Sequence, residues 1–310
     1  MLEKMPQENK LIAIIGPTAG GKTSVAANLA YHIDGEIISA DSRQIYRGMD
    51  LGTGKDIVDY TVNGKDIPYH LIDIVDAGYK YNVFEYQADF LKAYNDIKSR
   101  NKVPVLCGGT GMYVEAVTLG YKLINVPVDD ALRASFENMS DEELTALLKT
   151  KKSLHNTSDI NTRKRLVRAL EIAIYEENHP DEDYSFPKIE TQFFGVKYDR
   201  ESRRKRITER LKERLKTGMV EEVEMLIKQG VSPEDLIYYG LEYKFLTQYV
   251  TGEINYNDMF QRLNTAIHQF AKRQMTWFRR MERNGAKIKW LDGYMPMEEK
   301  MDTIMKMINE

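Results

Sequence analysis

Cysteine and histidine are scarce in this sequence. Cys107 is the only cysteine among 310 residues, so the chain can form neither an internal disulfide nor a cysteine-based zinc site. Such sparing use of cysteine is typical of the reducing cytoplasm, which is where we expect the protein to work. The five histidines are scattered along the chain and predict no metal site.

Long apolar runs are missing too. No stretch approaches the roughly 18 apolar residues that predict a membrane-spanning helix, and the polar start MLEKMPQENK shows no signal-peptide core. We therefore expect no membrane partner. A hydrophobic content of 42% and a charged content of 29% favour a soluble globular protein. The net charge of −3 argues weakly against nucleic-acid binding, but this average hides local asymmetry.

The first 120 residues alternate between strand and helix patterns. Short apolar runs predict strands at 11–16, 36–40 and 103–109, and helical spacing follows each of them, at 22–33, 82–100 and from 112 onward. Such alternation is typical of a parallel α/β sheet.

The pattern changes near residue 124. Only helical segments are predicted from 129 to about 178, after which strand spacing returns at 191–198. Two long helices, at about 201–229 and 257–283, and a last strand at 286–291 complete the prediction. We therefore predict a discontinuous α/β core, made of 1–123 and 191–310, with a helical insertion at 124–190.

The segment GPTAGGKT matches the phosphate-binding loop pattern G-x-x-x-x-G-K-[ST], and it lies between a predicted strand and a predicted helix. Its glycines let successive backbone N–H groups face phosphate oxygens, and the following helix N-terminus adds positive potential. Lys22 supplies a charge to the terminal phosphate, and the Thr23 hydroxyl can hold Mg²⁺. The pattern predicts a diphosphate or nucleotide site made of Gly16, Pro17, Thr18, Ala19, Gly20, Gly21, Lys22 and Thr23.

Two further loops should meet this cradle. Asp41 follows the second predicted strand, and the GGTG loop at 108–111 follows the third, so both reach the edge where open α/β sheets bind ligands. Asp41 is then a candidate general base or metal partner. The alternative is a carboxylate that only caps the next segment. Thr110 has the same alternative.

Basic residues gather on three predicted helices. Residues 200–216 hold nine Lys or Arg and three Glu, 271–283 hold five basic residues and one acid, and 162–168 hold four basic residues and no acid. One such face is usually only solvated. Three of them, with Trp277 and Phe278 interleaved, favour a phosphate backbone with stacked bases, although Phe278 is more readily explained as a core residue.

These segments together resemble the tRNA dimethylallyltransferases, which prenylate an adenine beside the anticodon. The matching segments span most of the chain in the family's order: GPTAGGKT, DSRQIYRGMDLGTGK (41–55), PVLCGGTGMY (104–113), RLVRALE (165–171), TGMVEEV (217–223) and AKRQMTWFRR (271–280). DSRQIYRGMD and KRQMTWFRR are specific, whereas the phosphate loop alone is not. The resemblance implies a short bacterial form, because no Cys/His finger follows the core.

The resemblance also implies roles for individual residues. Asp41 would take a proton from the N6 amine of adenine 37 as that nitrogen attacks dimethylallyl diphosphate. The phosphate loop, with Mg²⁺ on Thr23, would hold the leaving diphosphate, with Arg206 as a further contact. Thr110 would line the passage where the substrates meet. The tRNA anticodon stem-loop would be held by Asp41, Ser42, Arg43, Gln44, Thr110, Arg165, Arg168, Arg273 and Arg279.

Some features depart from the family or leave other functions open. Lys164 stands where the family usually carries Gln, and YYGLEYK (238–244) matches the family's Gly-Tyr-x-Glu segment only loosely. A P-loop kinase using ATP would explain GPTAGGKT but not the basic helices. A non-enzymatic RNA-binding NTPase switch would explain the basic helices but not Asp41. We expect a monomer, and the sequence does not decide whether ATP also binds the cradle.

Overall fold

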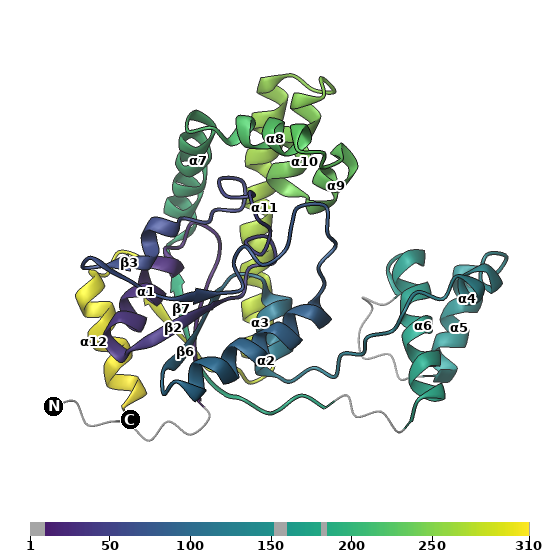
Figure 1. Ribbon diagram of the computed structural model, residues 1–310, viewed down its shortest axis with the longest axis horizontal. Helices are drawn as coiled ribbons and strands as arrows, with labels where there is room; N and C mark the ends of the chain where they lie inside the picture. The colour runs from purple at the N-terminus through teal and green to yellow at the C-terminus, as the bar shows by residue number, and fades with distance from the viewer. Residues whose placement is uncertain (1–9, 152–159, 181–184, 310) are drawn as a thin grey trace. The chain divides into compact units, whose positions relative to one another are not determined.

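The computed structural model describes residues 10–151, 160–180 and 185–309. The chain divides into two compact units: Met1–Gly120 with Pro187–Glu310, and Tyr121–Phe186. The division falls a few residues from the predicted boundaries of the insertion. The predicted fold class is confirmed, because the first unit is a parallel α/β core and the second is helical (Figure 1).

A six-stranded parallel sheet lies at the centre of the core unit, with the strand order β5-β2-β6-β1-β7-β8. Its strands are β1 (Lys10–Ile15), β2 (Gly35–Ser39), β5 (Tyr69–His70), β6 (Val103–Gly108), β7 (Glu190–Lys197) and β8 (Ile288–Asp292). The central strand β1 pairs with both β6 and β7, so Ile12 lies opposite Val105 on one side and Gln192 on the other. Strands from both halves of the core therefore build one sheet.

Each face of the sheet is covered by helices. Ile12, Ile14 and Val105 belong to an apolar core that also includes residues of α1 (Lys22–Ile33) and α12 (Met297–Ile308). Because side chains alternate along a strand, the residues between them point to the other face, where α2 (Val83–Ser99) and α3 (Gly111–Thr118) lie (Figure 1). A short helix η1 (Ile57–Tyr60) and a hairpin of β3 (Thr61–Val62) and β4 (Lys65–Asp66) contact α1.

The C-terminal helices differ from the prediction in one respect. The helix predicted at 201–229 is wrong as a single element, because it is divided into α7 (Arg200–Lys216) and α8 (Met219–Lys228). Gly218 has a φ of 111° between them, which is left-handed backbone that ends a helix. Two short helices, α9 (Pro233–Tyr239) and α10 (Leu241–Val250), follow and were not predicted. The predicted long helix is confirmed as α11 (Tyr256–Arg283).

The inserted unit contains α4 (Asp130–Ser135), α5 (Asp141–Lys151) and α6 (Arg163–Asn178). It has a small apolar core of its own, in which Leu144 and Leu148 of α5 pack with Leu166 and Leu170 of α6. The buried carboxylate of Glu171 adds a polar tie at one side of this core. The unit can therefore hold its own shape.

Candidate active site

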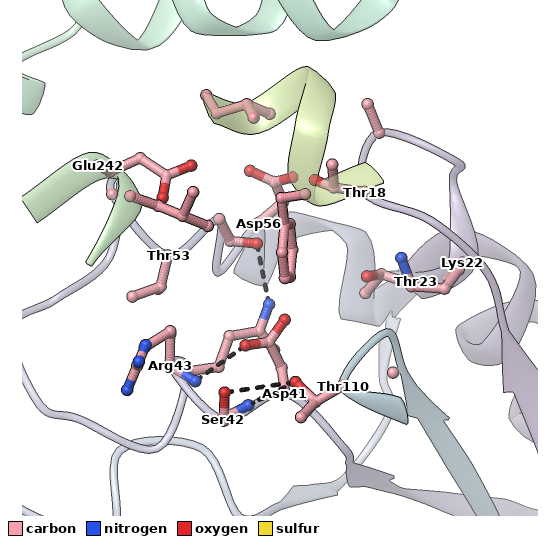
Figure 2. A pocket seen from close by; sticks show the side chains of 18 of the residues that line it. Thr18, Lys22, Thr23, Asp41, Ser42, Arg43, Thr53, Asp56, Thr110 and Glu242 are labelled. Carbon is pink, nitrogen blue, oxygen red and sulfur yellow. Dashed lines mark hydrogen bonds between the residues drawn. The ribbon is translucent and has the colours of Figure 1, made fainter. Parts of the chain in front are cut away.

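A cavity of about 470 Å³ opens at the carboxyl edge of the sheet. The loops after β1, β2 and β6 all contribute to its wall, as parallel strands require, and α7, α10 and α11 complete it. Figure 2 shows Asp41 and Thr110 facing the same space as Lys22 and Thr23. The two loops predicted to meet the phosphate cradle thus do so.

The loop 16–23 has the backbone that a phosphate cradle needs. A Cβ at Gly16 would lie 2.5 Å from the carbonyl oxygen of Val196, so only glycine permits this approach to β7. Gly21 is the N-cap of α1 and offers no side chain to the amides of its first turn. Those N–H groups, with the helix dipole behind them, favour an anion at this point.

Lys22 lies inside the cavity wall without a carboxylate partner at hydrogen-bond distance in the described structure. Its ammonium Nζ donates to the Pro17 carbonyl at 2.9 Å, which bends the side chain back over the loop. Burial lowers the pKa of Lys22, and the nearby Asp41 partly opposes this. Burial also raises the pKa of the neighbouring Cys107 thiol to about 12, so this thiol stays neutral. A bound diphosphate would supply the negatively charged partner that Lys22 lacks.

Asp41 and Thr110 are placed by backbone contacts between their two loops. The Thr110 amide donates to the Ala40 carbonyl at 3.1 Å, and the Ser42 amide donates to the Thr110 hydroxyl at the same distance. Thr110 is the N-cap residue of α3, but its hydroxyl makes no capping bond. One Asp41 oxygen accepts from the Arg43 amide at 2.9 Å, a local turn contact that fixes the carboxylate beside the cavity.

The 50–52 turn of the 41–55 loop is held by a buried carboxylate from α8. Glu222 accepts hydrogen bonds from the amides of Asp50, Leu51 and Gly52, at 2.8, 2.6 and 3.0 Å. The Tyr243 hydroxyl also donates to it, at 2.6 Å. Hydrogen bonds to a charged group are strong, so the three amides that bind Glu222 fix this turn against α8.

Gln274 of α11 joins the phosphate loop to the GGTG loop. Its Oε1 accepts from the Thr18 amide at 2.8 Å, and its Nε2 donates to the Gly109 carbonyl at 2.9 Å. The side chain is buried. One amide thus sets the spacing between the cradle and the loop that carries Thr110.

Three arginines of α7 lie at the phosphate loop or at the cavity, and one of them is Arg206, the expected diphosphate contact. Arg206 Nε donates to the Ala19 carbonyl at 3.1 Å, and its guanidinium lies 4.3 Å from the Tyr198 ring centroid. Arg206 therefore contacts the backbone of the phosphate loop. Arg210 and Arg214 line the cavity itself, and each donates to Asp56 at 2.8 Å.

The other basic residues predicted to bind tRNA are also spread out. Arg43 lies at the cavity, with its guanidinium 5.7 Å from the Tyr239 ring centroid. Arg273 of α11 lines the cavity as well. Arg279 is exposed and close to Arg203 of α7, whose pKa is lowered by burial first and by this arginine second. Of these residues, Arg43 and Arg273 are grouped with Asp41.

In the inserted unit, the two arginines predicted to bind tRNA differ in their surroundings. Arg168 donates to Glu171 at 3.0 Å and to the Val126 carbonyl at 2.6 Å. Arg165 is exposed, as is Lys164, and no partner of the Arg165 guanidinium is found among the described residues. Arg165 is therefore free to meet a ligand, whereas Arg168 already holds the unit together.

The cavity and support residues that were not predicted include Arg210, Glu222, Glu242 and Gln274. Gln274 lies inside the matched segment AKRQMTWFRR, and Glu222 inside TGMVEEV, so the family segments marked their neighbourhood but not their roles. Burial of a polar side chain was the missing signal, and a sequence does not display it. Phe278, expected in the core, is fully buried.

Two absences apply to residues 10–151, 160–180 and 185–309. No cluster of three or more His, Cys, Asp or Glu side chains there could hold a metal ion unaided. Within the same ranges, no helix is long and apolar enough to cross a membrane.

Comparison with known proteins identifies the family. The sequence model of IPP transferase matches residues 44–281. A tRNA dimethylallyltransferase from Bacteroides fragilis is 60% identical over 300 residues, covering 97% of this chain and 98% of that protein. One from Phocaeicola vulgatus is 58% identical over 299 residues, covering 96% and 97%.

A solved structure of a related enzyme supports the same family. The tRNA isopentenylpyrophosphate transferase from Bacillus halodurans superposes with a TM-score of 0.72 at 30% identity, covering 97% of this chain and 96% of that one. The resemblance found in the motifs is confirmed over nearly the whole length. The chain therefore belongs to the IPP transferase family, that of the tRNA dimethylallyltransferases.

Proposed function

We propose that this protein transfers a dimethylallyl group from dimethylallyl diphosphate to the N6 amine of adenine 37 in certain tRNAs, releasing diphosphate. One observation carries the proposal: the phosphate cradle and the Asp41 carboxylate line a single cavity. A site for the leaving group thus faces a base for the nucleophile. Membership of the family supports the same reaction.

The chain's own groups account for the bond changes. The adenine N6 forms a bond to the allylic carbon while the carbon–oxygen bond to diphosphate breaks, and Asp41 accepts the proton that N6 loses. The amides of loop 16–23 and Lys22 stabilise the negative charge that gathers on the departing diphosphate. Thr110, fixed between Ser42 and Ala40, lines the point where the two substrates meet.

Mg²⁺ suits this site as a shared ligand of protein and substrate. Mg²⁺ usually takes one or two protein oxygens and fills its remaining positions with phosphates and water, so it needs no protein cage. The Thr23 hydroxyl lines the cavity beside Lys22 and is the oxygen that would hold it. When bound, the ion supplies additional neutralisation of the diphosphate charge.

The tRNA would be held from the mouth of the cavity outward. Ser42, Arg43 and Gln44 lie at the cavity beside Asp41, and Arg273 approaches from α11. Adenine 37 must leave its stack to reach Asp41, as in other base-modifying enzymes. Arg165 of the inserted unit would contact the anticodon stem. We include in the proposal a monomeric enzyme that works in the cytoplasm.

A transfer assay tests the proposal. The protein is incubated with labelled dimethylallyl diphosphate, unmodified tRNA and Mg²⁺, without ATP, and label in the RNA is measured. Lys22→Ala should lower the rate ~10²–10³-fold through lost charge stabilisation, and Asp41→Asn ~10²–10⁴-fold through loss of the general base. Both should leave tRNA affinity nearly unchanged.

Lys102→Ala is the matched control for Lys22→Ala, because Lys102 pairs with Asp34 on the surface of the core unit. It should transfer at the wild-type rate. An ATP requirement with ADP formation and no labelled tRNA would instead indicate a kinase. Normal turnover of Lys22→Ala would mean that the loop has only a structural role.

A further inference from the structure

Glu242 is a cavity residue that the reaction described above does not use. It lies in the first turn of α10, directly after two residues with left-handed backbone: Gly240 with a φ of 73° and Leu241 with a φ of 41°. Leucine rarely adopts this conformation, and such strain gathers at functional sites. The consequence is visible in Figure 2, where the Glu242 carboxylate points into the cavity that Asp41 faces.

The surroundings of Glu242 are apolar on one side. It shares a small recess with Ile207, Leu211, Met219 and Ile267, all of which are buried. This apolar floor disfavours a charged carboxylate, so burial raises the pKa of Glu242 to about 7.

Charged groups from three elements face Glu242. Arg210 and Arg214 come from α7, and their partner Asp56 comes from the loop before η1. Asp41 comes from the loop after β2. The two arginines oppose the effect of burial but do not overcome it. The Glu242 carboxylate accepts a hydrogen bond from its own backbone N–H, and among the described residues no side chain donates to it, so part of its capacity is left for a ligand.

We propose that Glu242, as a neutral carboxylic acid, reads the target adenine by donating its O–H to the ring nitrogen, N1 or N7, that flanks the reacting amine. This inference rests on the proposed function. Its carbonyl oxygen accepts the N6–H that Asp41 does not take. Adenine carries the N6 amine, a donor, beside a ring nitrogen that accepts, whereas guanine has a carbonyl oxygen in place of the amine.

The neutral form suits the site for an electrostatic reason. A further ionised carboxylate in this cavity, which Asp41 and Asp56 also line, would add negative charge close to the departing diphosphate. A protonated one supplies a donor without that charge. In many active sites the surroundings keep one carboxyl group ionised and another protonated, so that one acts as a base and the other as a donor.

Substitutions at Glu242 separate this role from a structural one. Glu242→Gln keeps the shape and one donor but cannot ionise, and Glu242→Leu removes both donor and acceptor. Glu234→Gln on α9 is the matched control, because Glu234 is exposed. Each variant is assayed for kcat/KM with an anticodon stem-loop RNA at saturating dimethylallyl diphosphate, between pH 5.5 and 9.

For wild type and the control, we expect kcat/KM to fall as the pH rises through about 7, because Glu242 then ionises. Glu242→Gln should lose this fall and stay within about threefold of wild type at pH 6. Glu242→Leu should lose about 10- to 100-fold, the usual effect of one buried hydrogen bond. The KM for dimethylallyl diphosphate should not change in any variant.

RNAs with 1-deazaadenosine or 7-deazaadenosine at the target position locate the contact. One of the two should cost wild type about tenfold or more and cost Glu242→Leu nothing further. Equal penalties in both proteins would overturn the proposal. It would also be overturned if Glu242→Gln were as slow as Glu242→Leu, or if the variants raised the KM for dimethylallyl diphosphate instead. If wild type itself transferred no prenyl group, the proposed function would have failed, not this assignment.

Discussion

The Glu222 carboxylate gives the sharpest test of how the active-site loop is held. It is buried on α8 and accepts from three successive amides, those of Asp50, Leu51 and Gly52. The Tyr243 hydroxyl is its fourth donor. Glu222→Ala removes the acceptor and leaves all four donors without a partner.

The expected loss of stability follows from this count. An unpaired buried donor costs about 1–3 kcal/mol, and donors in a partly exposed loop regain some water, so the low end of that range applies to most of them. We expect Glu222→Ala to lower the free energy of unfolding by about 3–5 kcal/mol, a large share of the roughly 5–15 kcal/mol of a typical domain. Glu222→Gln, which can still accept two of the four bonds, should lose about half as much.

Urea unfolding followed by tryptophan fluorescence measures this loss. Both tryptophans, Trp277 and Trp290, belong to the core unit, so the signal reports on the unit that contains Glu222. Glu224→Ala is the control, since Glu224 is an exposed residue of the same helix. It should change the free energy of unfolding by less than about 0.5 kcal/mol.

Catalysis should fall with stability in Glu222→Ala. The loop that Glu222 holds also carries Gly54, whose carbonyl accepts from Gln44 at 3.1 Å. Looser loop residues should therefore lower the turnover of the folded protein. A loss of stability below about 1 kcal/mol, with normal turnover, would refute the view that this carboxylate organises the loop.

Two further predictions concern the inserted unit and pH. Arg165→Ala should weaken tRNA binding and lower the salt slope of that binding by about one unit, with unchanged stability. In Arg168→Ala the inserted unit should melt at a lower temperature, because the ion pair with Glu171 is lost. Salt-dependent tRNA binding measures the first effect, and thermal melting followed by circular dichroism measures the second. The Arg100 guanidinium holds the pKa of the buried Glu36 below its ordinary 4.5, so this pair should stabilise the fold above about that pH and lose its effect as the pH falls further; an unchanged pH dependence of urea unfolding in Arg100→Gln would contradict this.

The sequence by itself determined the features that depend on consecutive residues. The phosphate loop is recognisable because eight successive positions set its backbone and charge. The strands and helices around it follow from apolar spacing in the same way. The roles of Asp41 and Thr110 at one edge required only that their strands be parallel, and the structure places both at one cavity.

The helix break at Gly218 could not be predicted from the spacing of apolar residues. The apolar spacing continues across Thr217 and Gly218, and a helix that ended there cannot be told by spacing from one that tolerates a glycine. The short helices α9 and α10 also lack enough turns for a periodic signal. The position of Glu242 could not be predicted either, because it depends on the strained turn between these two helices.

Only the tertiary structure decided which side chains complete the site. Glu222 acts on amides about 170 residues earlier in the chain, and Gln274 joins two loops that lie 165 and 256 residues before it. Arg168 and Arg165 look alike in sequence, yet one is tied to Glu171 and the other is exposed. Burial and long-range hydrogen bonding arise when distant segments pack together, and no local pattern of residues encodes them.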